Sequence, residues 1–267
     1  MKIGILGSEG FLGSELHSYF KVNHDVYGIT RSNYKQNKGE EFDIFINANG
    51  NSRRYWANNN ILEDYEASTS SVYKTFFHFK TEYYIYISSA EVYGSHRNLK
   101  KINENTVIDP KSLCAYGFHK YLSELIVKKY AKKYLILRCS AMIGRNIKKG
   151  PFKDLINDKP LFITPDSKLQ FITNSEIAKI IMKLINDDIY NEIFNVGGVG
   201  AITIDCLGKI LQKKLIMHKE AEKQVYKMNV SKLKRLFPIK KSIEYVKECL
   251  NEDIIGGVEN ERMDKSI

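Results

Sequence analysis

The stretch IGILGSEGFLGSEL, residues 3–16, decides the fold class of this chain. It starts as a short apolar run, passes through three glycines spaced three apart, and continues into a helical pattern. In this position Gly7 permits a tight turn, Gly10 lets the backbone approach a pyrophosphate, and Gly13 lets the helix pack closely on the strand. Free N–H groups at the helix N-terminus also attract phosphate. The residues expected to hold a dinucleotide at this turn are Gly7, Ser8, Gly10, Phe11, Leu12 and Gly13.

Strand and helix patterns alternate through the first half of the chain. Strands are expected at 2–6, 25–30, 42–48, 83–88 and 134–138, and helices at 11–20, 62–80 and 113–131. This alternation predicts an α/β fold with a doubly wound, Rossmann-like parallel sheet. The segment between Arg31 and Phe42 is too short for the further helix and strand of a full Rossmann half. We therefore expect the sheet to be shortened by one strand after the second strand.

After residue 145 the pattern loosens into short strand-like runs and helices. Strand-like runs occur at 161–163 and 171–172, and helical patterns at 176–185 and 204–211. We interpret residues 1–145 as a nucleotide-binding domain and 146–250 as a small mixed substrate-binding subdomain, some of whose elements can return to the sheet. Residues 251–267 form a polar tail in this interpretation.

The composition of the chain limits the classes of function that it can have. The chain has 267 residues, of which 43% are hydrophobic and 27% charged, as in ordinary soluble proteins. Its apolar runs fall short of the ~18 residues that span a bilayer. Glycines and glutamates near the N-terminus are unlike a signal peptide, so we expect a cytoplasmic protein without membrane contact.

The net charge of +10 is spread along the whole chain. This distribution favours a solvated lysine-rich surface with an anionic small substrate, and it gives no sign of a nucleic acid partner. The four cysteines lie far apart without a CxxC pattern, and the histidines are scattered. We expect no metal site and no disulfide framework.

The residues after the second strand bear on the choice of cofactor. An acidic residue there would bind a free ribose 2′-hydroxyl. Here the strand is followed by Arg31 and Ser32, and arginine suits a 2′-phosphate. The alternative is an exposed turn arginine. We predict NADP, with NAD left as a second possibility.

Several further motifs carry a family resemblance. The fourth strand runs into SSAEVYG at 88–94, and YGFHK follows at 116–120. Later fragments are LILRCSAMIGR at 135–145, FITNSEIA at 171–178 and EIFNVGG at 192–198. Together with the glycine turn, they resemble the extended short-chain dehydrogenase/reductase family, in particular its nucleotide-sugar epimerases, dehydratases and reductases.

The resemblance implies a catalytic set of Tyr116, Lys120 and Ser89. A free tyrosine has a pKa of ~10, and a lysine one helical turn away, with a cationic nicotinamide, favours its phenolate. Tyr116 would exchange a proton with a sugar oxygen, while Ser89 would hold that oxygen. Further residues that the resemblance implies beside the cofactor are Asn47, Ala48, Asn49 and Ser88, together with Tyr116 and Lys120.

Two departures from the family pattern limit the assignment of activity. Dehydratases carry acidic or polar residues after the catalytic serine or threonine, where this chain has Ala90 and Glu91; Ala90 argues against dehydration, and an extra base at Glu91 stays open. A loop with Arg53 and Arg54 replaces the usual histidine-containing segment after the third strand. The expected substrate-side residues are Ser89, Ala90, Glu91, Arg53, Arg54 and Arg145, the arginines being alternatively solvent-exposed.

The leading hypothesis is an NADPH-dependent reductase of a 4-keto nucleotide sugar, with tyrosine as proton donor. The first alternative is an epimerase that transiently oxidises a nucleotide sugar. A redox-sensing binding protein on the same fold is a second alternative, which the tyrosine–lysine pair disfavours. The resemblance also implies a homodimer that pairs the helices at 62–80 and 113–131.

Overall fold

The computed structural model describes residues 1–94 and 102–251, and its centre is a six-stranded parallel sheet. The strands lie in the order β10-β5-β4-β3-β1-β2. Their bounds are β1 Lys2–Leu6, β2 Asp25–Ile29, β3 Glu41–Asn47, β4 Lys80–Ser89, β5 Lys133–Cys139 and β10 Glu192–Val196. This arrangement confirms the predicted doubly wound α/β fold.

The sheet ends at β2, as the short spacing to the next strand predicted. Within the described residues, no strand lies beyond β2, and residues 30–40 form turns before the chain enters β3. Tyr34 closes this edge, because its ring packs on Phe79 and its hydroxyl lies 2.9 Å from Nδ1 of His78. The shortening therefore brings residues just after β2 close to the helices beneath the sheet.

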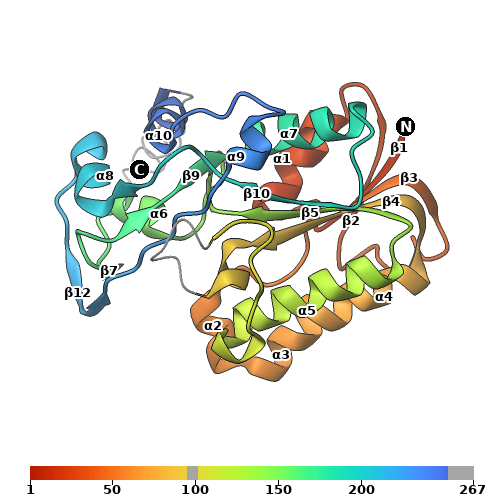
Figure 1. The fold of residues 1–267 in the computed structure, drawn as a ribbon, viewed down its shortest axis with the longest axis horizontal. Helices are drawn as coiled ribbons and strands as arrows, with labels where there is room; N and C mark the ends of the chain where they lie inside the picture. Colours follow the sequence, from red (N-terminus) through yellow and green to blue (C-terminus); the bar gives the residue numbers. More distant parts are fainter. Residues whose placement is uncertain (95–101, 252–267) are drawn as a thin grey trace, which may run out of the picture.

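Helices cover both faces of the sheet (Figure 1). On one face lie α1 (Phe11–Phe20) and α7 (Asn174–Asn186). On the other face lie α2 (Arg54–Asn59), α3 (Ile61–Tyr65), α4 (Ser71–His78) and α5 (Ala115–Tyr130). The helix expected over 62–80 is present as α3 and α4, joined by a π-helical turn at Glu66–Ser70.

The side chains of strand β4 enter two separate hydrophobic cores, one on each face of the sheet. Ile85 and Ile87 join the cluster that contains residues of α1 and α7. Tyr84 and Tyr86 point the other way, into the cluster that includes Val127 of α5. Successive strand residues face opposite sides, and both sides are buried, as is usual for a parallel sheet.

The second half of the chain forms small sheets and short helices at one end of the molecule (Figure 1). Its short strands are β6 Ala141–Ile143, β7 Leu161–Ile163, β8 Lys168–Leu169, β9 Phe171–Thr173, β11 Ile202–Thr203 and β12 Met217–Glu222. Its other helices are α6 Pro151–Ile156, α8 Ile204–Leu211, α9 Ser231–Lys234 and α10 Ser242–Asn251. The helices expected at 176–185 and 204–211 are α7 and α8.

Two elements of the second half return to the first. Strand β10 pairs with β5 in parallel, from Glu192 opposite Leu135 to Val196 opposite Cys139, and α7 packs against α1. The polar tail expected over 251–267 lies, apart from Asn251, outside the described residues. None of the helices that the structure describes is long and apolar enough to cross a membrane.

Candidate functional site

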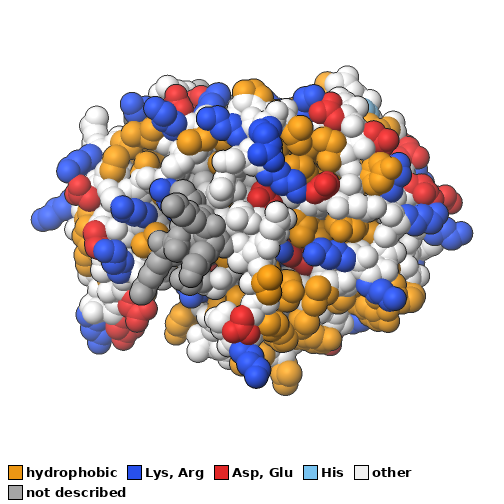
Figure 2. Space-filling model, viewed as in Figure 1, with side chains coloured by type: hydrophobic (Ala, Val, Ile, Leu, Met, Phe, Trp, Pro, Cys, Tyr) orange, Lys and Arg blue, Asp and Glu red, His pale blue; other side chains and the backbone are white. Residues whose placement is uncertain are grey.

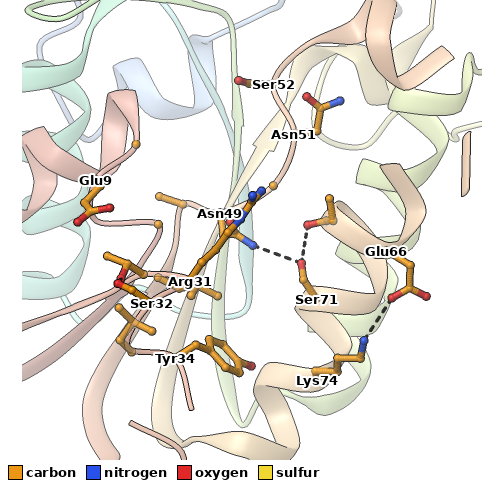
Figure 3. A pocket seen from close by; sticks show the side chains of 18 of the residues that line it. Glu9, Arg31, Ser32, Tyr34, Asn49, Asn51, Ser52, Glu66, Ser71 and Lys74 are labelled. Carbon is orange, nitrogen blue, oxygen red and sulfur yellow. Dashed lines mark hydrogen bonds and ion pairs between the residues drawn. The ribbon is translucent and has the colours of Figure 1, made fainter. Parts of the chain in front are cut away.

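A groove of 1240 Å³ opens where β1, β2 and β3 end (Figure 3). Parallel α/β sheets bind ligands at this edge. The groove takes its walls from the glycine turn, the segment after β2, the loop after β3 and the π turn before α4. Among its lining residues are Gly7, Gly10, Arg31, Ser32, Ala48, Asn49, Gly50 and Arg53.

The glycine turn is a cradle that side chains would fill. Gly7 has a φ of +85°, and a Cβ there would lie 3.1 Å from the Ala48 carbonyl carbon. A Cβ on Gly13 would lie only 2.0 Å from the Gly7 oxygen, so the helix packs directly on the turn. Gly10 immediately precedes α1 and lines the groove, with no side chain capping the helix N–H groups. The turn therefore fits the pyrophosphate of a dinucleotide.

The other predicted residues of the turn hold it in place. Leu12 is buried in the core. The Phe11 carbonyl accepts a hydrogen bond of 2.9 Å from Nδ2 of Asn174 on α7. Ser8 is buried against Gly28 of β2, where a Cβ would lie 2.8 Å from its hydroxyl oxygen. These contacts fix the backbone that faces the groove.

The end of the groove after β2 is cationic. Arg31 and Ser32 line it, and the Arg31 side chain reaches toward Asn49 (Figure 3). Lys35 and Lys74 line it as well. Neither lysine was predicted, because only the fold brings 35 and 74 to the same wall. Lys74 pairs with Glu66 at 3.2 Å. Arg31 and Lys35, in contrast, have no carboxylate partner among the described residues.

The loop after β3 is built on Asn47. Its buried side chain donates to the Tyr84 hydroxyl at 2.8 Å and accepts from the Asn49 backbone N–H at 3.0 Å. Asn49 in turn lies 3.4 Å from the Ser71 hydroxyl. Ala48 and Asn49 thereby line the groove, whereas the Asn47 side chain supports the loop from inside.

Tyr116 lies in the first turn of α5, beside the 3₁₀ turn that follows β4. A Cβ on Gly117 would be 2.5 Å from the Glu91 carbonyl oxygen, so the helix start is pressed onto that turn. The Tyr116 side chain is buried and hydrogen-bonds with Ser89. Burial raises the pKa of Tyr116 above its usual value, and the bond with Ser89 offsets only part of this rise. The phenol is therefore held in its protonated form.

Lys120 is buried one turn further along α5. Its ammonium donates to the Ile87 carbonyl at 3.1 Å and lies 5.1 Å from the centre of the Tyr86 ring. Burial lowers the pKa of Lys120 to about 8, against smaller opposing effects of nearby acidic groups. A Cβ on Gly50 would lie 3.5 Å from its Nζ, so this lysine adjoins the groove wall. Ser89, Tyr116 and Lys120 are thus gathered around the end of β4.

Ser88 points away from the groove into a buried polar network. Its hydroxyl donates to Glu124 at 2.6 Å, and Glu124 is paired with Arg138 at 2.6 Å. Arg138 also donates to the Tyr93 hydroxyl, which donates to Asn195. Strand alternation could have indicated this, because Ser88 follows Tyr84 and Tyr86 onto the face covered by α5.

Glu91 forms an ion pair with Arg54 of α2. Its carboxylate lies 3.4 Å from Nε of Arg54, and that guanidinium donates to the Tyr226 hydroxyl at 2.7 Å. Burial raises the pKa of Glu91, while Arg54 acts in the opposite direction. Ala90 is buried beside it. Tyr226, which sequence reasoning missed, comes from the second half of the chain.

The two remaining predicted arginines lie apart. Arg53 lines the groove near Ser52 and Lys148. Arg145 instead lines a separate cavity of 190 Å³ with Glu15 and Thr173. The structure therefore brings Arg53 but not Arg145 to the main groove.

Comparison with known proteins gives a family match. The model of the family described as NAD dependent epimerase/dehydratase matches residues 40–197, which is more than half of the chain. No match is found among curated proteins.

Solved structures share the fold at low identity. A UDP-glucuronic acid 4-epimerase from Bacillus cereus, in complex with a fluorinated UDP-sugar and NAD, has a TM-score of 0.74 at 18% identity, covering 94% of this chain and 98% of its own. A dTDP-4-dehydrorhamnose reductase from Bacillus anthracis, in complex with NADP, has a TM-score of 0.76 at 17% identity over 94% and 98%. A UDP-glucose 4-epimerase from Thermotoga maritima has 0.74 at 14% over the same shares.

Proposed function

The chain belongs to the NAD-dependent epimerase/dehydratase family, whose enzymes are of the extended short-chain dehydrogenase/reductase type, and we propose that it is an NADPH-dependent reductase of a 4-keto nucleotide sugar. A nicotinamide dinucleotide is the cofactor of this family. The observation that carries the finer proposal is the cationic end of the groove after β2, where Arg31 and Lys35 have no carboxylate partner among the described residues.

The charge at that end favours NADP over NAD. In a dinucleotide bound on the glycine turn, the adenosine ribose lies at the end of β2. A 2′-hydroxyl there is recognised by a carboxylate, while a 2′-phosphate is recognised by arginine and lysine. The acids that line the groove are Glu9, on the glycine turn, and Glu66, which pairs with Lys74. Arg31 and Lys35 are therefore the residues proposed to hold the 2′-phosphate.

Tyr116 is placed to act as the proton donor of a reduction. The bound nicotinamide would supply the hydride to the keto carbon. Tyr116, kept as a phenol by burial, would donate its proton to the ketone oxygen, and Ser89 would hold that oxygen by a hydrogen bond. Lys120 would orient the cofactor from beside the groove wall at Gly50. Ala90 lacks the acidic group that dehydration would need.

The test is steady-state turnover with a panel of 4-keto nucleotide sugars and both reduced cofactors. We expect NADPH to be consumed in proportion to the keto sugar and faster than NADH. Tyr116→Phe should lower kcat by about 10²–10⁴-fold, the usual contribution of a positioned acid, with the NADPH Kd unchanged. Equal use of NADH, or full activity of the variant, would contradict the proposal.

The second candidate is a nucleotide-sugar epimerase. It is favoured by the 4-epimerases among the similar structures, two of which were solved with UDP-sugars. An epimerase must oxidise and then reduce the same sugar, so it needs Tyr116 in both protonation states and consumes no external cofactor. Turnover of an unmodified UDP-sugar without added NADPH would identify this activity.

A homodimer is the proposed assembly. Large hydrophobic side chains gather at the lower edge of the molecule in Figure 2, over α3, α4 and α5. Tyr73, Phe77 and Tyr130 are exposed there, with ring centroids 4.9–5.8 Å apart. We call these residues, with Leu62 and Tyr65, the α3–α5 apolar face. Clustered large apolar side chains on a surface support an interaction site there.

A further inference from the structure

A buried ion pair joins α5 to β5 beside the end of β4. The side chains of Glu124 and Arg138 are 0% and 2% exposed, and Oε2 of Glu124 lies 2.6 Å from Nη2 of Arg138. Nε of Arg138 also donates to both carboxylate oxygens, at 3.0 and 3.2 Å. Because both side chains are closed off from solvent, an effect of the pair on a bound ligand must pass through the residues that it contacts.

One side of α5 carries this pair together with two residues of the proposed catalytic set. Tyr116, Lys120 and Glu124 follow one another at intervals of four residues, so they lie along the same side of the helix. The Glu124 carboxylate accepts a hydrogen bond of 2.6 Å from the hydroxyl of Ser88, near the end of β4. The next residue is Ser89, which hydrogen-bonds with Tyr116. The carboxylate therefore anchors the helix that carries Tyr116 to the strand that carries Ser89.

Arg138 connects the same pair to the turn after β4. Its Nη1 donates to the Tyr93 hydroxyl at 2.9 Å, and its guanidinium carbon lies 4.8 Å from the centre of the Tyr93 ring. Tyr93 ends the 3₁₀ turn Ala90–Tyr93 and donates to Asn195 of β10 at 2.6 Å. The network thus holds the backbone on both sides of Ser89.

A buried ion pair of this kind determines geometry more than stability. Its loss of hydration offsets much of its Coulomb attraction, and apolar side chains of similar volume often stabilise a fold equally well. Parallel hydrogen bonds between a guanidinium and a carboxylate, however, fix both the distance and the direction between the two groups, whereas apolar contacts have no preferred direction. Geometry matters at a catalytic site, because a misplacement of about 1 Å costs about 10²-fold in rate.

We propose that Glu124 and Arg138 are positioning residues, which hold Ser89 and Tyr116 at the separation needed to bind and protonate one ketone oxygen. This inference rests on the proposed function and deepens it, because it assigns the control of the catalytic geometry to a buried pair that takes no part in the proton transfer itself. Ser88 is the residue through which the pair acts on β4.

Ser88→Ala tests the connection to β4 while leaving the ion pair in place. We expect kcat to fall about 10-fold with NADPH and the keto sugar that wild type reduces fastest, and the keto-sugar KM to change less than about twofold. The reason is that α5 and β4 would be free to shift relative to each other, while the groove itself stays intact.

Ser242→Ala is the matched control for the loss of a buried serine hydroxyl. The Ser242 hydroxyl donates to the Gly200 carbonyl and accepts from the Phe171 backbone N–H, in the second half of the chain. Both substitutions should lower the melting temperature by about 2–10 °C, but Ser242→Ala should keep the kcat of wild type. Equal kcat values in the two variants would show an ordinary structural hydrogen bond and overturn the proposal.

A triple variant separates geometry from stability. Ser88→Ala, Glu124→Leu and Arg138→Met together replace the polar groups by apolar ones, so the melting temperature should stay within about 10 °C of that of wild type. The directional contacts are lost, and kcat should fall about 10²-fold. A triple variant with the kcat of wild type would overturn the proposal.

Hydrogen–deuterium exchange gives a measurement that does not depend on turnover. Backbone amides at 88–93 and 115–120 should exchange about 10-fold faster in Ser88→Ala than in wild type, while those of β1 should not change. Unchanged exchange in both segments would overturn the positioning role even if the reductase activity is confirmed. Faster exchange in a protein whose wild type reduces none of the keto sugars would refute the reductase activity and still confirm that the pair holds these two segments.

Discussion

Asp64 Oδ2 lies 2.6 Å from Nδ1 of His119, and both side chains are closed off from solvent. The other Asp64 oxygen accepts hydrogen bonds from Ser68 at 3.2 Å and from Asn51 at 3.0 Å. One carboxylate therefore joins α3, α5 and the loop that lines the groove.

Replacing Asp64 should destabilise the fold strongly. Asp64→Ala leaves His119, Ser68 and Asn51 without their buried acceptor, and we expect a loss of about 3–5 kcal/mol in the free energy of unfolding. Asp187→Ala is the control, since Asp187 forms an exposed pair with Lys183, and such pairs contribute about 0–1 kcal/mol. Urea unfolding followed by circular dichroism measures both. Equal small losses would show that the buried carboxylate contributes little.

Lys120 should make stability depend on alkaline pH. Its pKa is about 8 in the folded protein, below the ordinary value of 10.5, so folding opposes its charge. The cost is fully present below pH 8 and disappears as pH rises past about 10.5, above which the lysine is neutral in both states. Relative to Lys120→Met, wild type should gain about 1–3 kcal/mol of stability between pH 7.5 and 10.5. A constant difference in unfolding free energy across this range would contradict the assigned environment.

Much of the fold could be predicted from local sequence patterns. The glycine turn, β1 and α1 are contiguous, so spacing and hydrophobic pattern alone predicted them. The pairing of β10 with β5 was not identified, because EIFNV is a short apolar run that fits a strand of any sheet. The sequence indicated only that later elements could return. The π turn at Glu66–Ser70 also escaped prediction, since the hydrophobic pattern continues through it.

The candidate site, like the fold, was predicted from the sequence only in part. Tyr116, Lys120 and Ser89 came from recognisable motifs, and the structure gathers them. Lys35 and Lys74 had no signal, because a lysine in a lysine-rich chain looks like solvated surface until the fold brings it to a groove. The partnership of Asp64 with His119 joins separate helices, which no local pattern reveals.

Cofactor preference should follow the residues after β2. Arg31→Ala and Lys35→Ala each remove a cation beside the proposed 2′-phosphate site, and we expect the NADPH Kd to rise about 10-fold in each. The NADH Kd should change less than about twofold, since NADH lacks that phosphate. Fluorescence titration of both cofactors provides the measurement. Lys21→Ala, just beyond the far end of α1, serves as the control. Parallel weakening of NADH would mean that these cations hold the pyrophosphate instead.

Charge placed on the α3–α5 apolar face should break the proposed dimer. Phe77 is 62% exposed and packs against the rings of Tyr73 and Tyr130, and a paired copy would bury it. Phe77→Asp would place a carboxylate in that apolar interface, where desolvation is unfavourable without a partner. Light scattering coupled to size exclusion should show a dimer for wild type and a monomer for the variant. Val22→Asp, equally apolar and 77% exposed just beyond α1, should remain dimeric. A wild-type monomer, or dissociation of both variants, would contradict a dimer through this face. Only a contact centred on α4 and α5 would be broken by Phe77→Asp and left intact by Val22→Asp.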